Sequence, residues 1–168
     1  MHSEVPSTPA KIPEESGPTG VQENGLLGPW YANTLSIRQQ RFIHYMSCQS
    51  LLSVVVWLRE TRTAEERLRR SLSELLWEFG VAETSITSEL EAMAFFVYRR
   101  ASDRSHLASM RGQMIIARNA VLDGRAVTPR DITIHLARMP IGSLGFNTPR
   151  ELTLEILPLP KPTNSRGA

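Results

Sequence analysis

Arginine residues form the pattern in this sequence that is best suited to chemistry. The row consists of Arg104, Arg111, Arg118 and Arg125, which recur every seven residues, preceded by Arg99 and Arg100. Seven residues nearly complete two helical turns, so the first three arginines would form a line that drifts about 20° per step. Neighbouring guanidinium groups would start about 10 Å apart along the helix axis. The row therefore predicts a basic helix face.

Three interpretations of this face stay open. It can be solvated or paired within the chain, or it can be an assembly interface that pairs with carboxylates from residues 65–91 of a neighbouring copy. It can also bind the phosphates of a nucleic acid. The third interpretation is weakened because only 2 of the 19 basic residues are lysine and no aromatic side chain is interleaved with the row.

Motifs for catalysis or cofactor binding are absent from the sequence. It has no glycine-rich phosphate loop and no nucleophile elbow. The four histidines lack metal-ligand spacing, and Cys48 is the single cysteine. These absences predict a protein that is not an enzyme and uses no cofactor. An enzyme of unrecognised class stays as an alternative, because the members of a catalytic triad meet in space rather than in sequence.

The segment 36–62 is predicted to be the central helix. Ser36 and Gln39 fit a capping box at its start, and seven of the eight residues in 51–58 are apolar, as expected of a buried helix. A strand is the competing interpretation, because residues 54–56 are all the β-branched valine. The apolar block is too short to cross a membrane, which takes about 20 residues.

Three further helices are predicted to follow. The helix 64–79 carries leucines on one face and has Gly80 where a C-terminal cap belongs. A helix over 89–100 would begin at Ser88 and be apolar nearly all round. The helix 105–122 shows an inward seam that alternates spacings of three and four residues: Leu107, Met110, Met114, Ala117 and Val121.

The C-terminal third allows two structures. Thr128, Pro129 and Asp131 predict a helix that runs to Met139, because threonine caps helices and proline suits their first position. The segment 152–157 alternates apolar and polar residues, and it is left undecided between helix and strand. A hairpin of 131–138 with 152–157 is the main structural alternative.

Part of this region resembles the helical lid of MoxR-type AAA+ ATPases. The likeness rests on Ser102-Asp103-Arg104, on the helical stretch 107–120 and on the run from Asp123 to Ile132. In that family the arginine at the position of Arg104 would sense the nucleotide. The P-loop and the acidic Walker B strand are missing here, so the resemblance implies a helix–turn–helix over 105–139 and no ATPase activity.

Taken together, the patterns predict a mainly α fold: a single compact helical bundle of about five helices, with the small C-terminal β-hairpin as an alternative element. Residues 1–28 are expected to be a disordered acidic arm, 29–160 the helical domain and 161–168 a disordered tail.

The expected function is that of a self-associating interaction or assembly protein, with a virus or mobile element as one source. The expected partners are a second copy, an acidic protein or, as the alternative function, a nucleic acid, and no transmembrane segment is expected. The single cysteine and the Pro- and Glu-rich N-terminus predict an intracellular protein, cytoplasmic or nuclear rather than secreted.

Overall fold

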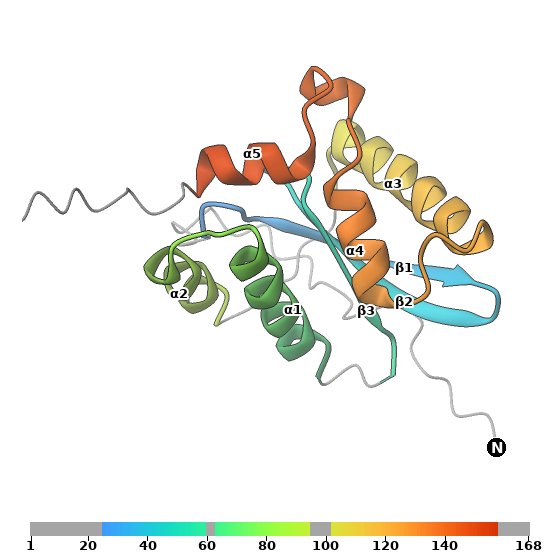
Figure 1. Ribbon diagram of the computed structural model, residues 1–168, viewed down its shortest axis with the longest axis horizontal. Helices are drawn as coiled ribbons and strands as arrows, with labels where there is room; N and C mark the ends of the chain where they lie inside the picture. Colours follow the sequence, from blue (N-terminus) through green and yellow to red (C-terminus); the bar gives the residue numbers. More distant parts are fainter. Residues whose placement is uncertain (1–24, 60–62, 95–101, 158–168) are drawn as a thin grey trace, which may run out of the picture.

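The computed structural model describes residues 25–59, 63–94 and 102–157. Within these ranges three antiparallel strands come first, β1 (Trp30–Ile37), β2 (Gln40–Ser47) and β3 (Ser53–Trp57), in the sheet order β1-β2-β3. The described helices then follow, as Figure 1 shows: α1 (Ala64–Glu78), α2 (Glu83–Ala92), α3 (Arg104–Leu122), α4 (Pro129–Ala137), the short 3-10 helix η2 (Gly142–Leu144) and α5 (Pro149–Ile156). The fold is therefore α+β, with the strands leading.

The prediction of a mainly helical bundle is wrong, and the error lies in the segment 36–62. Ser36 belongs to β1, and Gln39 lies in the turn to β2 rather than in a helix cap. Arg38 and Gln39 have φ values of 47° and 64°, which fits a two-residue turn of type I′. Such a turn joins antiparallel strands because its twist matches theirs.

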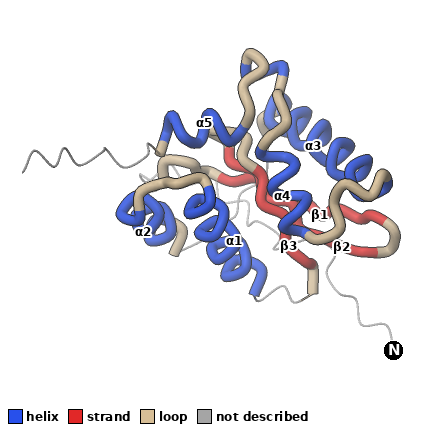
Figure 2. Tube along the Cα trace, in the orientation of Figure 1, coloured by secondary structure: helices blue, strands red, loops and turns tan. Residues whose placement is uncertain are grey.

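The apolar run 51–58 is explained by a sheet that is buried on both faces. Ile43, Tyr45, Val54 and Val56 pack in one core with α1 and α2, whereas Phe42 and Val55 pack in another with α3 and α4. Figure 2 shows the strands running between these two groups of helices. A strand covered on both sides reads as a continuous apolar run, which is also how a buried helix reads.

Several of the predicted helices agree better with the structure. The helices expected at 64–79 and 105–122 are confirmed as α1 and α3. Thr128 caps α4 through the expected capping box with Asp131, and 149–156 is also helical, so the C-terminal hairpin is wrong. The helix expected at 89–100 instead runs over 83–92, and residues 95–101 lie outside the described ranges.

The segment before β1 is attached to α2. Leu27 is fully buried, and the buried Glu89 carboxylate accepts hydrogen bonds from the amides of Leu26 and Leu27, the second at 3.3 Å. Most of the predicted N-terminal arm (1–24) and the tail 161–168 lie outside the described residues. None of the helices within the described ranges is long and apolar enough to cross a bilayer.

Candidate interaction surface

Local sequence signals fix the position of α3. The Asp103 carboxylate accepts a hydrogen bond from the backbone amide of His106 at 3.0 Å and caps the first turn. Gly124, with a φ of +74°, takes the left-handed conformation just beyond the helix end. Of the predicted seam, Met110 and Ala117 are fully buried, and the other three members are half-buried. The face that flanks this seam on one side is turned to solvent.

That outer face carries an alternating row of basic and apolar residues, which we call the arginine stripe. Its members follow each other at spacings of four and three and are all exposed: Arg104, Ala108, Arg111, Ile115, Arg118 and Leu122. Ile115 is 63% exposed and Leu122 is 46% exposed. The structure thus brings three of the predicted arginines together on one face, and it adds apolar members that the heptad spacing alone had not indicated.

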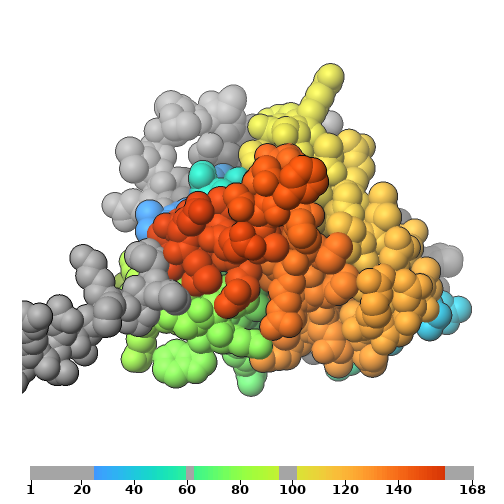
Figure 3. Space-filling model, turned by 45° about the horizontal axis from the view of Figure 1, so that its top comes forward, coloured from blue at the N-terminus to red at the C-terminus, as the bar shows by residue number. Residues whose placement is uncertain are grey.

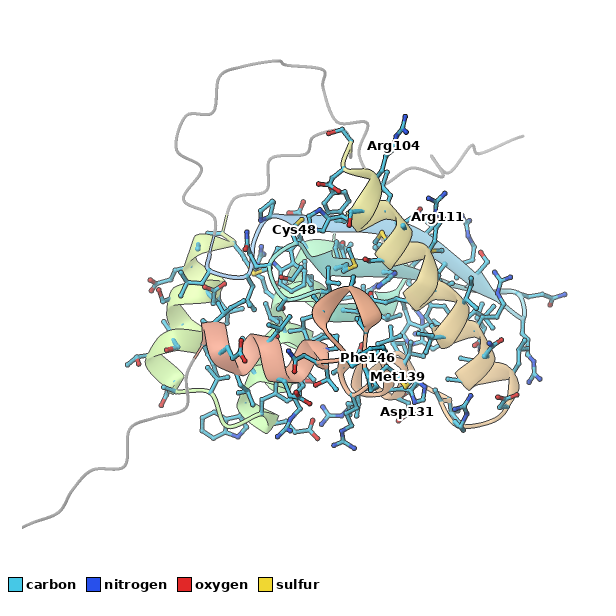
Figure 4. All side chains as sticks on the ribbon, turned by 90° about the horizontal axis from the view of Figure 1, so that it is seen from above. Cys48, Arg104, Arg111, Asp131, Met139 and Phe146 are labelled. Carbon is cyan, nitrogen blue, oxygen red and sulfur yellow. The ribbon has the colours of Figure 1, made fainter. Side chains whose placement is uncertain are left out.

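The predicted arginines differ in what they contact. Arg104 and Arg111 form no ion pair with any described residue, and Figure 4 shows both projecting from the same side of α3. Arg118 donates to the Ser36 carbonyl of β1 at 3.4 Å. Arg125 lies beyond the helix and pairs with Asp123 at 2.9 Å. Arg99 and Arg100 fall outside the described residues.

The helix α3 lies beside β1, and the stripe reaches that strand through Arg118. At one end the rings of Tyr31 and His106 are 5.4 Å apart. At the other end Arg38 donates to the Leu122 carbonyl, the last in α3, at 3.4 Å. Because both elements advance from the first contact to the second, α3 runs parallel to β1 (Figure 1). The hairpin turn adds the basic residue Arg38, which lies in the segment predicted to be the central helix.

Acidic residues gather on other helices. The exposed glutamates of α1 and α2 are Glu66, Glu74, Glu78, Glu83 and Glu91. Neither α3 nor the β1–β2 hairpin contains a glutamate. Figure 3 shows α5 and the loop before it on the surface between α3 and the α1–α2 pair. The stripe therefore lacks carboxylates, whereas α1 mixes its glutamates with Arg67, Arg69 and Arg70.

A small pocket of about 230 Å³ lies between α1 and α4, over the outer edge of β3. Arg130 of α4 closes over it by pairing with Glu78 at 2.9 Å and with Glu74 at 3.6 Å, both on α1. Arg70 also pairs with Glu74, and Arg67 donates to the Trp57 carbonyl, so the charged side chains that line the pocket are already bonded.

The side chains best suited to nucleophilic chemistry are either buried or held in an unreactive protonation state. His44 and Ser53 are buried between the sheet and α3, with His44 Nε2 2.7 Å from Ser53 Oγ, and Gln113 binds both. Burial lowers the pKa of His44 to about 4. Burial, followed by the Asp103 charge, raises the pKa of the Cys48 thiol to about 11, so Cys48 is a thiol rather than a nucleophilic thiolate at neutral pH.

The described residues offer no metal site. Across residues 25–59, 63–94 and 102–157, no group of three or more His, Cys, Asp or Glu side chains is placed to hold a metal ion. Among the described residues, the arginine stripe is therefore the surface whose charged side chains are most available to bind a partner.

The chain is similar to a known protein family. A family model described as a domain of unknown function (DUF6933) matches residues 4–152. No curated protein and no solved structure matches the chain.

Proposed function

We propose, on the geometry of the α3 surface and because the chain belongs to the DUF6933 family, whose function is unknown, that this protein is a non-enzymatic interaction protein. Its arginine stripe binds an acidic surface of a partner protein. The observation that carries the proposal is the exposed alternation of arginine and apolar residues along α3, with Arg104 and Arg111 free of ion pairs among the described residues.

The apolar members of the stripe favour a protein partner. Ile115 stands between Arg111 and Arg118 and is mostly exposed. Protein interfaces combine arginine with buried apolar anchors at their centres, whereas a phosphate-binding face gains nothing from an exposed isoleucine. The carboxylates of a partner would pair with the guanidinium groups, and burial of Ile115 would supply an apolar contribution.

A second copy of the chain presents a surface of the required kind. The exposed Glu83 and Glu91 of α2 form no ion pair with a described residue, whereas Glu74 and Glu78 of α1 already pair with Arg130. Contact between this face and the stripe of another copy joins two different surfaces, so it would build open or ring-shaped assemblies rather than a symmetric dimer. Light scattering at several protein concentrations measures this self-association.

Nucleic-acid binding is the second candidate, favoured by a separate observation. Arg38 of the β1–β2 turn extends the basic surface past the end of α3. Clustered arginines on one face are the electrostatic footprint expected for phosphate contacts. Such binding would fall steeply as salt rises.

The test is the binding of fluorescein-labelled poly-L-glutamate to the full chain. We expect the R111E/R118E variant to bind about tenfold or more weakly, because two attractive contacts become repulsive. The control is R59E/R138E, which makes the same change in net charge at exposed sites away from the stripe.

Equal weakening in both variants would mean that only net charge matters, and the proposed site would then be wrong. A DNA duplex that displaces the polyglutamate at about 150 mM salt would favour the second candidate.

A further inference from the structure

The outer edge of β1 is the second feature of this surface. No described strand pairs with it, since the sheet order is β1-β2-β3. The strand is eight residues long (WYANTLSI) and contains no proline, glycine or charged residue. Long uncharged edge strands of this kind are templates for pairing with another strand.

The backbone groups that face outward follow from the hairpin. Ile37 and Gln40 flank the two-residue turn and form a hydrogen-bonded pair. Such pairs alternate along an antiparallel ladder, so the N–H and C=O groups of Trp30, Ala32, Thr34 and Ser36 point away from β2. The bond from Arg118 to the Ser36 carbonyl agrees with this direction.

The two edges of the sheet differ in how their outward backbone groups are hydrogen-bonded. On β3, the outward Val55 amide donates to Thr133 Oγ1 of α4 at 2.9 Å, and the Trp57 carbonyl accepts from Arg67 of α1 at 3.1 Å. Both helices cover that edge. On β1, the Thr34 amide donates only to the side chain of its own neighbour, Asn33, at 2.8 Å and in an exposed position. The bonds on the β1 edge are made by two exposed side chains, Asn33 to the Thr34 amide and Arg118 to the Ser36 carbonyl, so two rotamer changes uncover it.

From this geometry we infer that the partner's acidic segment binds in extended form as a fourth strand on β1, beneath the arginine stripe. The inference rests on the proposed function in taking the partner to be acidic. Side chains of the added strand on the α3 side of the sheet would meet the stripe. Those residues are the ones that must be acidic.

The dimensions of the two elements agree. From Arg104 to Arg118 the stripe spans about 21 Å at the rise of an α-helix, and six residues of extended strand span about 20 Å. Side chains on one face of a strand alternate with those on the other. A six- to seven-residue segment therefore presents three or four carboxylates to the three arginines, and alternation of acidic and neutral residues is the expected motif.

Strand addition also predicts which amides of the added segment form hydrogen bonds to β1. In an antiparallel pair, directly opposed residues share a face, and the outward-facing residues of β1 have their side chains on the face away from α3. The neutral residues of the segment would therefore bond to β1, and the acidic residues would direct their amides to solvent. In a parallel pair the two sets exchange roles.

The test uses a fluorescein-labelled nine-residue peptide of alternating threonine and glutamate, with two N-methylated isomers of equal charge and composition. One isomer carries methyl groups on threonine amides, the other on glutamate amides. We expect one isomer to bind about tenfold or more weakly than the other, because its methyl groups block the bonds to β1. Loss in the threonine isomer indicates antiparallel addition, and loss in the glutamate isomer indicates parallel addition.

The protein side is tested with Thr34→Pro, which removes an outward amide from an edge position where proline is tolerated. We expect this variant to lose peptide binding while keeping the melting temperature of the wild type within a few degrees. Hydrogen exchange gives a second measurement that needs no variant. The amides of Ala32, Thr34 and Ser36 should become protected when the unmethylated peptide binds.

Equal binding of both isomers, with no new protection at these amides, would overturn strand addition. If R111E/R118E still abolished binding in that case, the proposed function would stand and the acidic partner would dock without extending the sheet. An unmethylated peptide that fails to bind even at low salt would also overturn the inference. The polyglutamate experiment would then decide the proposed function separately.

Discussion

Acidification should destabilise this fold through one buried histidine. His44 lies on β2, fully enclosed between the sheet and α3. Its Nε2 atom is 2.7 Å from Ser53 Oγ and 3.2 Å from Gln113 Oε1. Burial lowers the pKa of His44 from 6.5 to about 4, and the hydrogen bond to Gln113 opposes this shift only in part. Folding therefore requires the neutral imidazole.

The sign and size of the effect follow from proton linkage. The unfolded chain binds a proton at His44 below about pH 6.5, whereas the native state does so only near pH 4. The stability contribution is complete above the unfolded pKa and is lost as the pH falls toward the folded pKa. Between pH 7 and pH 5 the free energy of unfolding should fall by about 2 kcal/mol from this group.

Urea unfolding at pH 7, 6 and 5 measures the loss. His44→Gln is the matched variant, because glutamine keeps a polar side chain at this position but does not titrate. Other groups with shifted pKa values, such as His135, are common to both proteins and cancel in the difference. The wild type should lose about 2 kcal/mol more than the variant over this range. Parallel pH profiles for the two proteins would show that burial of His44 does not set the pH dependence.

Two further substitutions test other parts of the fold. Glu89→Ala should lower the free energy of unfolding by about 2 kcal/mol, because the amides that precede β1 lose their charged acceptor. The exposed Glu91→Ala on the same helix is its control and should change stability by less than about 0.5 kcal/mol in urea unfolding. Replacing Arg38-Gln39 with Asn-Gly should raise stability by about 1 kcal/mol, because both positions have positive φ. An unchanged or lower melting temperature in this variant would contradict the assigned turn.

The β1–β2 hairpin could not be predicted from the sequence because its turn lacks the residues that usually form a type I′ turn. A type I′ turn favours asparagine, aspartate or glycine, but here the turn residues are Arg38 and Gln39, which are good helix formers. Ser36 with Gln39 also imitates a capping box. Without a turn signal, the segment 36–62 reads as one long helix.

The heptad of arginines was predictable because it depends only on local structure. Asp103, the seam through Met110 and Ala117, and the terminal Gly124 all indicate the same helix. The exposed face then follows from the period of 3.6 residues. The neighbour of that face, β1, could not be inferred, because contact between elements more than sixty residues apart depends on the tertiary fold.

The position of the stripe above a free edge also explains how the edge can stay open in the isolated protein. Uncharged edge strands tend to pair with each other and aggregate, and natural sheets counter this with charge near the edge. A second β1 approaching in the symmetric arrangement would bring its own stripe next to Arg104, Arg111 and Arg118, and like charges would repel. An acidic strand meets no such barrier. The same three arginines would thus both disfavour symmetric pairing of two β1 edges and select for the carboxylates of the proposed partner.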